Sequence, residues 1–218
     1  MSWLSALAGL LMIATYVRAM VFTPPEALQG AAERIVYLHA PAAWVAFLAF
    51  GVVALASIGY LWLRDQRFDR LAASSAEVGE VFTTVVLITG PLWGRPIWGA
   101  WWVWDDLRLT LTLFMWFIYL TYFVLRRAID EPAQRARYCA VLGILGALLI
   151  PFIHLSVYLF RTQHPQPILM KPGRPSLPNN MLITLLLGFV SATVLYVAFL
   201  RTRYGIETAR AQRAAEVG

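Results

Sequence analysis

The sequence predicts an all-α, polytopic membrane protein that crosses the bilayer six times as a single domain, residues 1–218. Of the 218 residues, 60% are hydrophobic and only 14% are charged, whereas a soluble globular domain has about 45–50% apolar and about 25% charged residues. The hydrophobic residues also gather in runs of about 20, the length that a helix needs to cross the hydrocarbon core. A chain this short cannot hide so much apolar surface in a soluble fold, so the bilayer must cover it.

Six segments have the length and composition of membrane-spanning helices. They are Trp3–Phe22, Ile35–Leu63, Glu77–Trp93, Leu107–Leu125, Tyr138–Phe160 and Met181–Leu200. We interpret the first as a retained span, because it lacks the basic start and the cleavage site of a signal peptide. The third opens with Glu77 and Glu80, so either it starts deeper or these carboxylates face a protein interior. We expect Pro41 to break the second span near its start and Pro151 to kink the fifth.

The basic residues predict the orientation of the chain. The loops after the second and fourth spans and the C-terminal tail together hold eleven of them, and the other three loops hold five. Because loops rich in Lys and Arg remain in the cytoplasm, we expect both termini there and the loops 93–106 and 161–180 on the outer face. These short arginine clusters form no basic stripe, so the formal net charge of +6 does not indicate nucleic-acid binding. Membrane lipid is the expected partner of the surface.

The loop 93–106 has the most unusual composition. Five of the nine tryptophans lie in it, at Trp93, Trp98, Trp101, Trp102 and Trp104. Tryptophan is enriched at membrane–water interfaces, so an aromatic belt is one interpretation. However, Gly94 and Gly99 are interleaved with the rings, and glycine permits a flat ligand to approach the backbone. Since indole rings also stack on aromatic faces, we favour a shelf for a planar aromatic molecule.

Two of the three histidines, His39 and His164, map to the same expected outer face. A single histidine is most often a hydrogen-bonded structural residue, but two neutral imidazoles are a common axial pair for haem iron. His154 lies in the middle of the fifth span, and we interpret it as an interhelical hydrogen-bond partner. Cys139 is the only cysteine, which excludes an internal disulfide and a C-x-x-C-H haem attachment; it is predicted to be a small core residue.

Four charged side chains border the tryptophan-rich loop. Arg95 and Arg108 could pair with anionic groups such as haem propionates, or could extend to the lipid interface. Asp105 could contact a ligand or cap the fourth helix, and Asp106 follows it directly.

The residues from Trp93 to Asp105, followed by Arg108-Leu109-Thr110, resemble the tryptophan-rich signature of haem-handling membrane proteins. Among these they are most similar to the CcmC family, haem exporter protein C. The segments 34–44 and 151–164 resemble the two histidine regions of that family. The family usually has one residue between its Trp-Asp pair and Arg-Leu-Thr, where this chain has Asp106-Leu107.

The resemblance implies a haem-handling protein of cytochrome c biogenesis in the bacterial inner membrane. It would bind haem b as cargo at the periplasmic face, with His39 and His164 as axial ligands of the iron. The platform for haem and chaperone would consist of Trp93, Trp98, Trp101, Trp102, Trp104 and Asp105, with Arg95 and Arg108 beside it. The implied partners are the haem chaperone CcmE, CcmD, and the ABC transporter subunits CcmA and CcmB.

Other classes of function fit the sequence less well. A b-type membrane cytochrome or quinone-linked subunit usually has histidine pairs inside its helices at two depths, whereas this chain offers one outer pair and His154. A secondary transporter often has internal repeats, and none is evident. Because no nucleophile–base pair is visible either, an assembly factor is favoured over a conventional enzyme.

Overall fold

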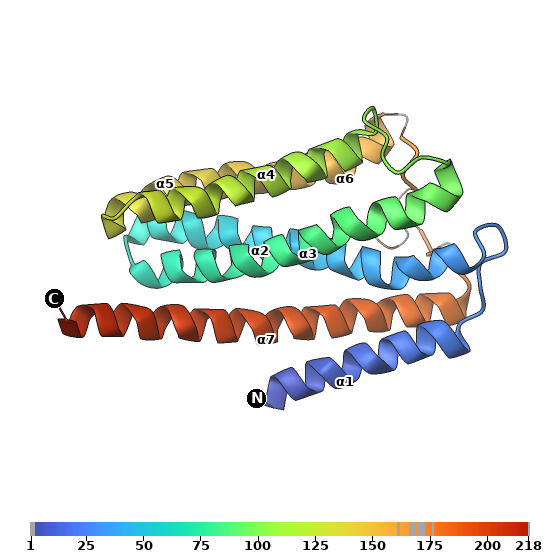
Figure 1. Ribbon diagram of the computed structural model, residues 1–218, viewed down its shortest axis with the longest axis horizontal. Coiled ribbons are helices and arrows are strands. Elements are labelled where there is room, and N and C mark those ends of the chain that lie inside the picture. Colours follow the sequence, from blue (N-terminus) through green and yellow to red (C-terminus); the bar gives the residue numbers. More distant parts are fainter. Residues whose placement is uncertain (1–2, 161, 166–168, 170–172, 176, 218) are drawn as a thin grey trace.

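In the computed structural model the helices stack in three layers (Figure 1). The structure describes residues 3–160, 162–165, 169, 173–175 and 177–217. The elements are α1 (Trp3–Val17), a π-helical turn η1 (Arg18–Phe22), a 3-10 turn η2 (Ala31–Ile35), α2 (Val36–Leu63), α3 (Gln66–Trp98), α4 (Leu107–Ala128), α5 (Pro132–Ala147), α6 (Leu149–Leu159) and α7 (Asn179–Val217). Helices α2 and α3 form the middle layer, with α4, α5 and α6 on one side and α1 and α7 on the other (Figure 1). The all-α fold is as predicted.

Six helical stretches of the described chain are long and apolar enough to cross a membrane, which confirms the predicted number. They are Trp3–Phe22, Ala31–Leu63, Gln66–Trp98, Leu107–Ala128, Pro132–Leu159 and Asn179–Ala214. The last turns of α7 lie at one end of the bundle, together with the loops that join α2 to α3 and α4 to α5, and we call this the terminus end (Figure 1). The opposite end, where α2 begins and α3 ends, is called the site end.

The third helix begins eleven residues before the predicted start, at Gln66 instead of Glu77. Its N-cap is Asp65, whose side chain accepts a hydrogen bond from the backbone N–H of Arg67. Of the two carboxylates at the predicted start, Glu77 forms an ion pair with Arg203 of α7. Glu80 is buried, in agreement with the expectation that it faces a protein interior.

The two prolines behave differently. The fifth span is divided into α5 and α6 at Leu148, because Pro151 has no N–H for the carbonyl group of Ala147 one turn earlier; the predicted kink is confirmed. The predicted break at Pro41 is wrong, since α2 continues through this residue to Leu63. Pro41 packs against Gly188 of α7, where an added Cβ would lie 2.9 Å from the proline ring.

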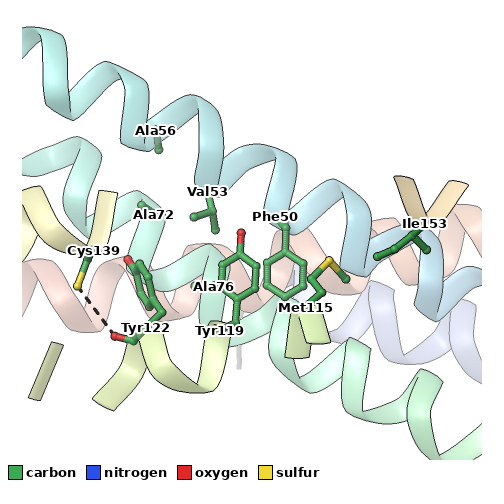
Figure 2. Close-up of a cluster of buried hydrophobic side chains, with 10 residues drawn as sticks. All are labelled: Phe50, Val53, Ala56, Ala72, Ala76, Met115, Tyr119, Tyr122, Cys139 and Ile153. Atoms are coloured by element: carbon green, nitrogen blue, oxygen red, sulfur yellow. Dashed lines mark hydrogen bonds between the residues drawn. The ribbon is translucent and has the colours of Figure 1, made fainter. Parts of the chain in front are cut away.

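The core holds the layers together through rings and small residues. Phe50 of α2 stacks on Tyr119 of α4, with ring centroids 3.6 Å apart (Figure 2). The Tyr119 hydroxyl donates to the Gly143 carbonyl of α5 at 2.9 Å, and at Gly143 an added Cβ would lie 2.8 Å from Val53. Small residues at helix contacts permit such close approach. Cys139 is buried in the same cluster (Figure 2), as predicted.

Candidate functional site

A cavity of about 620 Å³ lies between α2 and α3, and α4, α6 and α7 complete its walls. Its lining along α3 reaches from Trp98 to Thr83, a distance of about 22 Å in a helix. The polar and aromatic groups near the site end are His39, Trp93, Trp98, Trp102, Arg108, His154 and His164. The deeper wall is mainly apolar and includes Trp44, Phe47, Met115, Phe189, Val190 and Val194. The cavity therefore combines a polar mouth with an apolar interior that reaches into the bundle.

The two predicted outer histidines lie side by side in this cavity. His39 is in the first turns of α2, and His164 follows the end of α6. Their ring centroids are 6.3 Å apart, and the ring planes are inclined by 35°. Since a bond between a metal and an imidazole nitrogen is about 2 Å long, two such bonds and the half-widths of the rings add up to roughly this separation. The separation of the ring centroids equals that expected for two imidazoles that share one metal ion.

Hydrogen bonds select the protonated nitrogen of each ring. Nδ1 of His39 lies 2.9 Å from Oγ1 of Thr89, and that hydroxyl donates its own proton to the Val85 carbonyl at 2.7 Å. The hydroxyl therefore accepts from His39, whose Nδ1 must carry the hydrogen. Nδ1 of His164 lies 3.1 Å from the Pro165 carbonyl oxygen, which can only accept. In both rings Nε2 keeps its lone pair for a ligand, the arrangement that metal-binding histidines adopt.

The surroundings also keep His164 uncharged. The ring is only partly exposed, and its burial lowers the pKa to about 4 from the usual value, with a further contribution from the positive charge of Arg108. The hydrogen bond to Pro165 opposes this shift of the pKa. At neutral pH His164 is therefore a neutral imidazole.

Three of the five predicted tryptophans line the cavity. Trp93 meets His39 edge-on, with centroids 5.8 Å apart, and its indole N–H donates to the Gln29 side chain at 3.0 Å. Trp98 lies 6.4 Å from His164 and covers Gly94, where a Cβ would lie 2.8 Å from the indole. This contact explains one of the interleaved glycines. Trp102 is the third tryptophan that lines the cavity.

Trp101 and Trp104 are exposed, and both lie outside the described cavity lining. Trp104 packs against Trp102 with ring centroids 5.7 Å apart. The predicted loop 93–106 is helical as far as Trp98, and this tryptophan-rich segment has an inner and an outer group of rings. Asp105 is exposed beside the outer group.

The two arginines near the loop have different surroundings. Arg108 lines the cavity, and its Nη1 is buried without a hydrogen-bond partner in the described part of the chain. The indole N–H of Trp102 is likewise buried without a hydrogen-bond partner in the described part of the chain. Arg95 is exposed and donates to the Gly99 carbonyl at the end of α3. Of the two, Arg108 is the residue available to a ligand in the cavity.

The helix cap predicted for Asp105 belongs to Asp106. The Asp106 carboxylate accepts from the backbone N–H groups of Arg108 and Leu109 at the start of α4. A capping residue directly precedes the first helical residue, and Leu107 is that residue, so the position next to the apolar run was the better choice. The same carboxylate also accepts from the backbone N–H groups of Gln163 and His164.

Sequence reasoning also missed the positions of Thr89 and His154. Thr89 has no motif around it, and only its contact with His39 across two helices reveals it. His154 lines the cavity and lies 6.1 Å from the Tyr158 ring of the same helix; among the described residues it forms no hydrogen bond to another helix. Of the loop 161–180, residues 161, 166–168, 170–172 and 176 lie outside the described residues.

Comparison with known proteins shows the family of the chain. The sequence model of the family described as "Heme exporter protein C" matches residues 1–217. The chain belongs to this family. A heme exporter protein C of Bradyrhizobium diazoefficiens is 38% identical over 195 residues, which cover 89% of this chain and 73% of the relative. Relatives of the same name in Haemophilus influenzae and Escherichia coli are 34% and 36% identical, over 88% and 74% of this chain and 77% and 66% of their own lengths.

Proposed function

We propose that this protein handles haem during cytochrome c maturation, and that it holds haem b as cargo between His39 and His164. Membership of the heme exporter protein C family supports the haem-handling role. The observation that carries the site is the pair of imidazole rings 6.3 Å apart, each with Nδ1 engaged and Nε2 free to bind iron.

The surroundings of the pair favour haem over a bare metal ion. Among the described residues no group of three or more His, Cys, Asp or Glu side chains could hold a metal. Two imidazoles alone would leave most coordination positions of a transition metal unfilled. The four nitrogens of a porphyrin fill the equatorial positions, and bis-imidazole ligation then completes the iron.

The polar mouth of the cavity suits the propionates of haem. Buried polar groups are nearly always hydrogen-bonded, so the unpaired donors of Arg108 and Trp102 indicate a missing acceptor. A carboxylate is such an acceptor, and its bond to a guanidinium is charge-assisted. The apolar walls below would surround the macrocycle, as ligand cavities of this size usually do.

The outer group of the loop is a suitable contact for a partner. Exposed tryptophans such as Trp101 and Trp104 are typical of binding surfaces, and they lie beside Trp102 of the cavity. We propose that the haem chaperone CcmE docks here, at the periplasmic face of the bacterial inner membrane, with CcmD, CcmA and CcmB as further members of the assembly. Holding haem beside the chaperone would promote transfer by proximity.

The first test is the visible absorption spectrum of the detergent-purified protein. We expect a low-spin, six-coordinate haem b signal in the wild type. His39→Ala and His164→Ala should each lose haem or become five-coordinate, while His154→Ala should keep both axial ligands. Normal six-coordinate loading of all three variants would refute the ligand assignment, and absence of haem from a wild type supplied with it would refute the proposed function.

A further inference from the structure

Asp106 connects the start of α4 to the loop that carries His164. Its Oδ1 accepts from the backbone N–H groups of Arg108 and Leu109 at 3.0 and 3.3 Å. Its Oδ2 accepts from the backbone N–H groups of Gln163 and His164 at 2.9 and 3.1 Å. The side chain is 2% exposed, so these hydrogen bonds are formed away from water. One carboxylate thus uses both oxygens to join two segments far apart in the sequence.

The two proposed axial histidines differ in how the fold holds them. His39 is part of a long helix, is 7% exposed, and has its ring fixed by Thr89 of α3. His164 lies outside the helices, beyond the end of α6, and among the described residues the hydrogen bond of its ring goes to the neighbouring Pro165. The backbone bond to Asp106 is the long-range hydrogen bond that anchors the His164 residue.

We propose that Asp106 is the positioning residue of His164 and determines whether this histidine reaches the iron. The inference rests on the proposed function, because it assumes that His164 is an axial ligand. A charge-assisted hydrogen bond is stronger than a neutral one, and a buried carboxylate that lost its two loop partners would be left partly unpaired. The loop therefore stays next to α4, and His164 stays 6.3 Å from His39.

The helix cap and the anchor can be separated by one substitution. In Asp106→Ser the hydroxyl can still cap α4, since serine is a favoured capping residue, but it is too short to bond both the helix and the loop. Asp106→Asn keeps one carbonyl oxygen and can satisfy only one pair of N–H groups. For the exchange measurement on the haem-free protein, Asp105→Ser is the matched control, because Asp105 is the exposed neighbour.

The anchor itself is tested without haem. Hydrogen exchange measured by mass spectrometry on the haem-free protein should show faster exchange at Gln163 and His164 in Asp106→Ser than in the wild type. The start of α4 should exchange as in the wild type, and Asp105→Ser should change neither segment. Unchanged exchange at Gln163 and His164 would overturn the anchor.

The effect on the ligand is tested by the spectrum of the haem-loaded protein. Asp106→Ser should convert the six-coordinate signal to a five-coordinate one that added imidazole restores, and haem affinity should fall about 10-fold to 100-fold, as for other groups that support a ligand. The spectrum and the haem affinity of Asp106→Asn should lie between those of the wild type and of Asp106→Ser. In the double variant with His164→Ala, Asp106→Ser should add no further loss, because its effect passes through His164.

The outcomes separate the anchor from the function. A six-coordinate Asp106→Ser protein, or a double variant that binds haem clearly more weakly than His164→Ala, would overturn the positioning role. A wild type that binds no haem would overturn the proposed function and the ligand role together, and the exchange measurement would still decide the anchor.

Discussion

At the residue scale, Thr89 determines which nitrogen of His39 is free. The threonine accepts from Nδ1 because it donates to the Val85 carbonyl, and the ring cannot turn over without losing this bond. Groups that hold a metal-binding histidine in this way typically change metal affinity 10-fold to 100-fold when they are removed.

Thr89→Val should therefore weaken haem binding about 10-fold or more, with little change in fold because valine and threonine have similar shapes. Thr89→Ser should retain most of the affinity, since it keeps the hydroxyl. Thr121→Val, on the exposed face of α4, is the control. Haem titration followed by absorbance measures the effect, and equal affinities for the Val and Ser variants would show that the hydroxyl is not needed.

Arg108 has a role that depends on the charge of the ligand. Its guanidinium faces a cavity that is otherwise apolar toward the interior, so a carboxylate there gains a charge-assisted hydrogen bond. Arg108→Gln should weaken binding of haem about 10-fold or more, since a bond to a charged group contributes about 1.5–3 kcal/mol, and should hardly affect haem dimethyl ester. Arg95→Gln, at an exposed arginine outside the described lining, should change neither. If Arg108→Gln weakens both ligands equally, Arg108 supports the fold rather than the propionates.

At the scale of elements, a buried ion pair joins α3 to α4 at the terminus end. Arg126 donates to both oxygens of Asp69 at 2.7 and 2.9 Å, and the side chains are 16% and 6% exposed. Removing one partner of a buried pair leaves the other charge uncompensated, which costs about 3–5 kcal/mol.

Asp69→Asn should therefore lower the free energy of unfolding by about 3–5 kcal/mol, measured by denaturant titration in detergent. Arg210→Gln removes an exposed pair with Glu207, for which about 1 kcal/mol or less is expected. Because the pair is far from the site end, the haem spectrum of folded Asp69→Asn should equal that of the wild type. An altered spectrum would mean that the two ends of the bundle are coupled.

The same ion pairs explain why α3 begins before the predicted membrane span. Hydrophobicity marks only the apolar part of a helix, so the polar start of α3 around Asp69 fell between the second and third predicted spans, and Glu77 stood at the edge of the third. Both carboxylates are paired with arginines of other helices, and no local pattern reveals such a partner. Helix α7 likewise continues to Val217, beyond the predicted end at Leu200, because its last turns are polar and helical at once.

At the scale of the whole molecule, the sequence predicted which residues gather at the site end better than it predicted their contacts. His39 and His164 were expected on one face because loop order alternates along a chain of spans, and this rule needs no packing detail. Side-chain directions decide whether Asp106 or Asp105 caps α4. They also divide the tryptophans into an inner and an outer group. Such directions follow only from the packed loop.

The distribution of histidines over the molecule also bears on the electron-transfer alternative. All three histidines line one cavity, whereas a cytochrome that moves electrons across the membrane needs haem ligands at two depths. A single site near one end suits a protein that receives and passes on a ligand at that side of the bilayer.

The charge of the loops predicts the orientation of the bundle in the membrane. The arginine-rich loops join α2 to α3 and α4 to α5 at the terminus end, and loops of this kind remain in the cytoplasm. Leu28→Cys, at a 94% exposed position of the site-end loop, should react with a membrane-impermeant maleimide in spheroplasts. Arg210→Cys, at the exposed end of α7, should react only after lysis, and the buried Cys139 of the wild type should remain unlabelled in both. The reverse pattern would place the cavity mouth in the cytoplasm and exclude presentation of haem to a periplasmic chaperone.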